Sequence, residues 1–240
     1  MRISEVYLLD VLRRDKTLLV CSVHVMLSII VFSVLNYLTF SRGTTDGPEF
    51  IPYILWVFVY ISCFIPVKLA GWPLGSLGFA VSRVLLLTVA VSAVLGVWVF
   101  LALPNWRTIE PWSASLVVAF GRVGEELFFR GYVYLVFLKL FSEKRRPHLW
   151  AIWWSSVAFA LVHTQVLLPG NQISLGTVFI AGLLMAYLRH LTSSVLPAIT
   201  IHCFLNGHLL AVVGGWALYA VLVYWSAKVD GRTRMLRVAA

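Results

Sequence analysis

The stretch that decides the fold runs from residue 111 to residue 141 and reads PWSASLVVAFGRVGEELFFRGYVYLVFLKLF. It is long enough to cross a bilayer, because about 20 predominantly apolar residues span the hydrocarbon layer as a helix. Two acidic residues, Glu125 and Glu126, nevertheless lie near its middle. A carboxylate at that depth is costly and persists only when it is paired or faces a polar cavity. The stretch therefore predicts a membrane helix that carries a polar site.

The composition of the whole chain also indicates a membrane location. Of the 240 residues, 60% are hydrophobic and 12% are charged, with a mean hydropathy of +0.90, whereas roughly a quarter of the residues are charged in an ordinary soluble domain. The net charge of +9 comes from 19 basic and 10 acidic residues dispersed around apolar segments. We therefore expect the lipid bilayer as a partner and no nucleic acid.

Other apolar runs predict the remaining spans. Together with residues 111–141, the runs long enough to cross a bilayer are residues 17–40, 51–70, 79–103, 149–168 and 173–191. The run from Val195 to Ala227 contains Asn206-Gly207 and Gly214-Gly215, so we expect two shorter helices there. The sequence thus predicts an all-α, polytopic integral membrane protein with about eight transmembrane helices that enclose an intramembrane polar site.

We expect a single membrane domain over residues 1–240, since the sequence contains no internal repeat or soluble linker. Residues 1–16 interleave apolar and basic side chains and predict a cytosolic amphipathic segment on the membrane surface. Residues 111–213 carry all the motifs described below and are expected to form the catalytic core.

Basic residues predict the orientation, because Lys and Arg accumulate in cytoplasmic loops. With the N-terminus inside, the cytosolic side holds Arg2, Arg13, Arg14, Lys16, Lys68, Arg83, Lys139, Lys144, Arg145, Arg146, Arg189, Lys228, Arg232, Arg234 and Arg237. The outer side holds Arg42 and Arg107. Both termini are therefore predicted to be cytosolic, and we expect the membrane to be the plasma membrane of a prokaryote.

Helical geometry separates the two glutamates. Residues four apart share a face, so Glu126 is expected to pair with Arg122 one turn before it and Arg130 one turn after it. Glu125 points about 100 degrees away from that stripe and keeps at most a weaker contact with Arg122. We therefore expect Glu126 to be structural and Glu125 to be available for chemistry.

Two other predicted spans supply polar partners. His163 lies deep in the fifth span, and His202 and Asn206 share one face of the seventh. A carboxylate beside an imidazole can hold and deprotonate a water molecule, while an imidazole and a carboxamide can donate hydrogen bonds to a developing oxyanion. Cys203 follows His202 directly in the sequence and therefore lies about 100 degrees off its face, so no hydroxyl or thiol nucleophile is obviously placed beside a base. These groups favour hydrolysis of a peptide bond by direct attack of water.

The three motifs resemble those of a known family. Glu125-Glu126-x-x-x-Arg130, Phe159-x-x-x-His163 and His202-x-x-x-Asn206 occur in this order on successive apolar helices. The pattern is similar to that of the CAAX-processing and bacteriocin-processing (CPBP, or Abi) intramembrane endopeptidases of glutamate type. The resemblance covers roughly residues 111–213.

This resemblance implies a role for each residue. Glu125 and His163 would activate water, His202 and Asn206 would form the oxyanion site, and Glu126 and Arg130 would support the motif helix. The substrate would be a membrane-associated protein or peptide, such as a C-terminally lipidated tail, a leader peptide or a sorting tail. No cofactor is expected. The alternative is zinc held by Glu125, His163 and His202, because the family has also been described as metal-dependent and this ligand set is chemically acceptable.

Two other functions stay open on the sequence. One is a non-proteolytic scaffold or a bacteriocin-immunity-type protein of the same family, in which proteolysis is dispensable. The other is a proton-coupled transporter that uses Glu125 and His163 as a proton relay. This function is less favoured, because the sequence has no visible inverted repeat.

Overall fold

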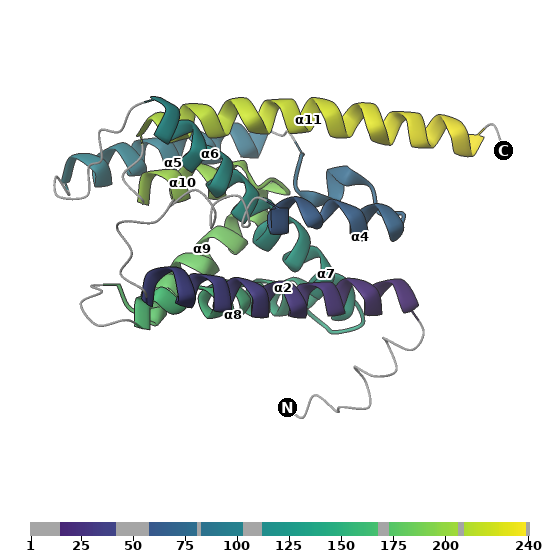
Figure 1. Ribbon diagram of the computed structural model, residues 1–240. Helices are drawn as coiled ribbons and strands as arrows, with labels where there is room; N and C mark the ends of the chain where they lie inside the picture. The colour runs from purple at the N-terminus through teal and green to yellow at the C-terminus, as the bar shows by residue number, and fades with distance from the viewer. Residues whose placement is uncertain are drawn as a thin grey trace. The chain divides into compact units, whose positions relative to one another are not determined.

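The computed structural model describes residues 15–41, 58–80, 83–102, 112–167, 173–205 and 209–238 (Figure 1). Their helices are α2 (Lys16–Ser41), α4 (Phe64–Leu69), η1 (Leu74–Leu77), α5 (Arg83–Ala102), α6 (Trp112–Glu126), the π-helical η3 (Leu127–Val133), α7 (Tyr134–Leu140), α8 (Pro147–Val162), η4 (Thr164–Leu167), α9 (Leu175–Thr192), α10 (Leu196–Leu205) and α11 (Leu209–Val238). An isolated antiparallel bridge joins Phe79 to Ser194. The described residues thus confirm the predicted all-α class.

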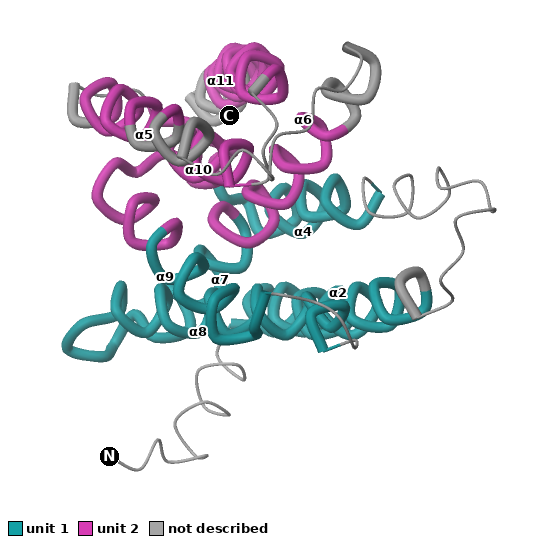
Figure 2. Tube along the Cα trace, turned by 90° about the vertical axis from the view of Figure 1, so that its left-hand side faces the viewer, with its two compact units in different colours: residues 1–72, 132–184 teal, residues 73–131, 185–240 magenta. Residues whose placement is uncertain are grey.

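The chain forms two compact units, each built from two separate segments (Figure 2). Unit 1 comprises residues 1–72 and 132–184, and unit 2 comprises residues 73–131 and 185–240. Each unit therefore depends on side chains that are far apart in the sequence.

In unit 1, α2 packs against α4, α7 and α8 (Figure 1). Its inner face is a stripe in which every third or fourth residue is buried: Leu18, Cys21, Val25, Ser28, Phe32 and Asn36. The opposite face is also apolar and includes Met26 and Ile30, each more than half exposed. A helix that is apolar on all sides is typical of a bilayer environment.

In unit 2, α10 packs against α5, α6 and α11. Seven of its residues are buried, including His202. The approach of α11 is close at Gly215, where a Cβ atom would lie 2.9 Å from Ile199 Cγ2. A larger residue at this position would push α11 away from the helix that carries His202.

The segment before α5 is fixed to the rest of unit 2 by hydrogen bonds. The backbone N–H groups of Leu74 and Gly75 donate to the carboxylate of Asp230, at 3.0 Å each. Gly78 has φ = +106°, and its carbonyl accepts a hydrogen bond from Val195 N–H at 3.0 Å. The third predicted span is therefore wrong at its start: Phe79 belongs to the bridge, and α5 begins at Arg83.

The other predicted spans compare as follows. The fourth is confirmed as helical over residues 112–140, although with a π-helical segment inside it. The fifth is too long, because α8 ends at Val162. The run from Val195 forms two helices as predicted, with Gly214 and Gly215 inside α11. Residues 51–57 of the second span and residues 1–14 of the amphipathic segment lie outside the described residues.

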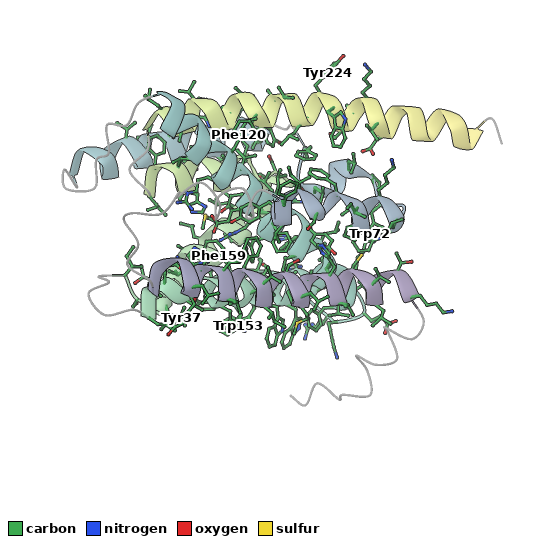
Figure 3. The ribbon with its side chains drawn as sticks, in the orientation of Figure 1. Tyr37, Trp72, Phe120, Trp153, Phe159 and Tyr224 are labelled. Carbon is green, nitrogen blue, oxygen red and sulfur yellow. The ribbon has the colours of Figure 1, made fainter. Side chains whose placement is uncertain are left out.

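Three helices in the described part are long and apolar enough to cross a membrane: Lys16–Leu38, Leu175–Thr192 and Leu210–Gly231. Shorter apolar helices occupy residues 58–69, 85–94, 147–162 and 196–205. Large side chains on the outer faces, such as Tyr37, Trp153 and Tyr224, are about half exposed or more (Figure 3). An exterior of this kind fits lipid better than water, but the count of eight spans stays a prediction.

Candidate active site

Glu126 is the centre of a buried polar cluster in unit 2. Its carboxylate is fully buried and lies 3.2 Å from Arg130 Nε through Oε2 and 3.3 Å from Arg130 Nη1 through Oε1. The guanidinium of Arg130 is itself 1% exposed. His202 Nδ1, from α10, lies 2.6 Å from Glu126 Oε1. The predicted structural role of Glu126 toward Arg130 therefore has a geometric basis.

Glu125 is also buried, at 4% exposure, but it contacts a different arginine. Arg122 Nη1 lies 3.0 Å from Glu125 Oε2, and the Arg122 side chain is 31% exposed. The structure therefore shows the i,i+3 contact of Arg122 with Glu125, which we expected to be the weaker contact of that arginine. The side chain of Arg122 reaches the carboxylate one residue before the i+4 position because both spacings are accessible on a helix.

His202 faces both glutamates. Its Nε2 atom lies 3.9 Å from Glu125 Oε2, while Nδ1 contacts Glu126. An ionised carboxylate can only accept hydrogen bonds. Nδ1 therefore carries a proton and donates a hydrogen bond to Glu126. The other nitrogen then faces Glu125, either with a lone pair in the neutral ring or with a second proton in the charged ring.

The helix that carries the glutamates changes its winding immediately after them. Residues 127–133 form the π-helical segment η3. Such segments are rare in proteins as a whole, but many of those that occur lie at functional sites. Within this segment, Gly131 approaches the backbone of Leu77 so closely that a Cβ atom would lie 2.6 Å from the Leu77 carbonyl oxygen. Glycine is therefore required where the motif helix meets η1.

His163 lies at the C-terminal end of α8, in unit 1. The sequence predicted a position deep in a span, but the helix ends one residue earlier, at Val162. His163 has φ = −88° and ψ = 44°, and its Nδ1 lies 2.7 Å from the carbonyl oxygen of Phe159. Because the other candidate residues belong to unit 2, the meeting of His163 with Glu125 stays a prediction.

The remaining predicted residue, Asn206, lies outside the described residues. In the part of the chain that the structure describes, no three His, Cys, Asp or Glu side chains gather as a metal-binding group. Within unit 2, Glu125 and His202 Nε2 are the predicted zinc donors that lie near each other. A His whose other nitrogen donates to a carboxylate is a common arrangement around zinc, so this half of the zinc set fits its chemistry.

Two buried carboxylates and a buried imidazole thus lie together in unit 2. Residues 106–208 match the family described as Rce1-like, type II CAAX prenyl endopeptidase. No curated protein and no solved structure matches the chain.

This match to the Rce1-like family confirms the predicted resemblance to CAAX-processing endopeptidases. This is a protease family, and the match supports a peptidase at the family level. The apolar helices and the matched family together indicate an integral membrane protein.

Proposed function

We propose that this chain is an intramembrane endopeptidase that hydrolyses a peptide bond of a membrane-associated protein or peptide. The observation that carries the proposal is the buried group of Glu125, Glu126 and His202 in an apolar helical unit. Such a group costs free energy in a bilayer. We therefore assign a catalytic role to this buried group, which accounts for its presence despite the cost.

In this mechanism Glu125 and His163 hold and deprotonate a water molecule. Arg122 contacts the Glu125 carboxylate and helps to direct it. The Nδ1–H group of His163 donates a hydrogen bond to the Phe159 carbonyl, because a carbonyl oxygen can act only as an acceptor. The neutral ring then has its lone pair on Nε2. A carboxylate and an imidazole lone pair are both suited to take a proton from water.

His202 and Asn206 stabilise the oxyanion that forms when water attacks the scissile carbonyl. His202 donates through Nε2 only when its ring carries both protons, since Nδ1 donates to Glu126. Arg130 holds Glu126 in place and thereby holds the His202 ring. Donors fixed before the reaction stabilise a transition state without a reorganisation cost.

The proposed substrate class follows from the family to which the matched segment belongs. A CAAX prenyl endopeptidase family favours a C-terminally lipidated tail over a leader or sorting peptide. A farnesylated peptide that ends in Cys-aliphatic-aliphatic-X is therefore the first probe to test.

We further propose that residues 1–240 form a single membrane domain with eight spans and a catalytic core at residues 111–213. Both termini lie in the cytosol, and the membrane is the plasma membrane of a prokaryote. The proposal is supported by the one-sided distribution of basic residues in the sequence.

The first prediction concerns this topology. Truncated chains fused to a reporter after Val213 should report outside, whereas a fusion at Ala240 should report inside, because the last span returns the chain to the basic side. Paired phosphatase and fluorescent-protein fusions measure the two locations. Two fusions that report the same side would contradict the eight-span arrangement.

A second prediction concerns the oxyanion site. His202→Ala or Asn206→Ala should lower kcat by about 10²–10³, the usual cost of one oxyanion donor, with little change in KM. Cleavage of the farnesylated probe in proteoliposomes measures both constants. His190→Ala, on α9, is the matched control and should retain the wild-type kcat.

The same assay distinguishes the zinc alternative, in which Glu125, His163 and His202 would hold the ion and zinc would activate the water. Without metal, a chelator that leaves the protein folded should leave kcat unchanged. The opposite result would be one tightly bound zinc per chain, with activity that is lost when the zinc is removed and restored when it is added back. That result would replace the metal-free mechanism and identify these three residues as zinc ligands.

A further inference from the structure

The C-terminal end of α8 has an unusual set of hydrogen-bond partners. The last four carbonyl groups of an α-helix have no partner within the helix, and here they belong to Phe159, Ala160, Leu161 and Val162. In a bilayer each unsatisfied backbone group costs several kcal/mol, because no water is available. Their partners therefore decide whether the helix can end at this point.

His163 itself satisfies two of the four carbonyls. Its backbone N–H donates to Ala160 at 3.0 Å, and its ring Nδ1 donates to Phe159 at 2.7 Å. The ring also packs against Phe159, with 4.4 Å between the ring centroids; Phe159 is labelled in Figure 3. The imidazole is thus part of the helix end, so its orientation depends on how that end is held.

Residues of α2 satisfy the other two carbonyls. Ser33 Oγ lies 3.1 Å from the Leu161 oxygen, and Asn36 Nδ2 donates to the Val162 oxygen at 2.5 Å. The two residues are three apart and share one face of α2. Thr164 completes the connection with a hydrogen bond from its hydroxyl to the Ser33 carbonyl at 3.0 Å.

Asn36 is the stronger of the two donors from α2. The Ser33 hydroxyl has one proton and also lies 2.8 Å from the Ile29 carbonyl of its own helix, so its bond to Leu161 is shared. The Asn36 amide nitrogen is directed at Val162, the residue immediately before His163, and Asn36 is 8% exposed. Burial of a polar side chain such as this amide is costly unless it is hydrogen-bonded, so the bond to Val162 offsets the cost of placing Asn36 on a mostly apolar stripe.

We propose that Asn36 is a positioning residue for catalysis, which fixes the α8 end and thereby the Nε2 lone pair of His163. The inference rests on the proposed function, because it requires that His163 activates water. It extends that function to a residue of the first membrane helix, outside the matched family segment of residues 106–208.

The test is a double-mutant cycle on the full-length protein in proteoliposomes, with the farnesylated peptide as the probe. Asn36→Leu keeps the number and branching of the side-chain heavy atoms and removes the donor. It should lower kcat by about 10–100-fold, as expected for a displaced catalytic group, and should leave KM unchanged. In a His163→Ala background the same change should have no further effect, because the group it positions is absent.

Ser28→Ala is the matched control, since Ser28 is a buried hydroxyl on the same face of α2. It should leave kcat unchanged in both backgrounds. Should Asn36→Leu fail to fold, Ser33→Ala replaces it in the same cycle, with a smaller expected loss of about 2–5-fold for a shared bond.

The outcomes separate the inference from the proposed function. An equal loss of kcat in both backgrounds, or wild-type kcat in Asn36→Leu, overturns the positioning role while the function stands. Wild-type activity in His163→Ala overturns the role of His163 and with it the positioning role of Asn36, whereas an absence of cleavage by the wild-type protein overturns the proposed function itself. A loss of kcat that disappears in the His163→Ala background supports both.

Discussion

Glu125→Gln is expected to abolish peptide hydrolysis in a protein that still folds. Gln has the same shape but cannot take a proton from water, so we expect kcat to fall by about 10³-fold or more. Folding should survive, because the partner of Glu125 is Arg122, whose side chain is 31% exposed and can be solvated once the carboxylate is gone. Cleavage of the farnesylated probe, together with the yield of folded protein, measures both effects.

Glu143→Gln is the control for this substitution, because Glu143 lies exposed in the turn between α7 and α8. It removes one carboxylate without touching the site and should leave kcat unchanged. Co-expression of candidate substrates with Glu125→Gln also tests the scaffold alternative. A variant that does not cleave but retains the biological activity of the wild type would favour a scaffold or immunity protein.

Glu126→Gln is expected to have the opposite effect, a loss of folded protein. Arg130 is 1% exposed and would lose the charge that balances its own, and His202 would lose the acceptor of its Nδ1 proton. Breaking a buried ion pair by removing one partner costs about 3–5 kcal/mol. The yield of monodisperse protein and its thermal midpoint in detergent measure the loss.

A compensating variant makes this second prediction specific. Glu126→Gln combined with Arg130→Met removes the stranded charge as well, and replacement of a whole buried pair by uncharged groups is often neutral. We therefore expect the double variant to recover most of the folded yield without recovering activity. If Glu125→Gln and Glu126→Gln reduce the folded yield equally, the assignment of one glutamate to chemistry and the other to structure is wrong.

Much of the site was predictable because its signals are local. Apolar residues surround Glu125 and Glu126, and a charge in such a run is conspicuous without any structure. Helical spacing also identified Arg130 as a partner of Glu126. The close contact of Arg122 with Glu125 was less accessible, since i+3 and i+4 contacts have similar geometry and their closeness depends on the surrounding packing.

Contacts between distant segments could not be predicted. Nothing in the sequence indicated that His202 donates to Glu126, because residues 76 positions apart are brought together only by the packing of α10 against α6. The early end of α8 was missed for a similar reason. Residues 163–168 read as a continuation of an apolar helix, but donors from α2 allow the helix to end at Val162. The π-helical segment after Glu126 has no sequence signal that we recognise.

The interleaving of the two units has a consequence for how the protein is made. Unit 1 joins residues 1–72 to residues 132–184, so α2, a candidate membrane span, is synthesised well before α8. Until then the Asn36 amide has no carbonyl of Val162 to bind, and a polar group lies in lipid without its final partner. Biogenesis of this protein therefore passes through a stage in which its first helix must be held, by the insertion machinery or by neighbouring helices, until the chain that completes it has emerged.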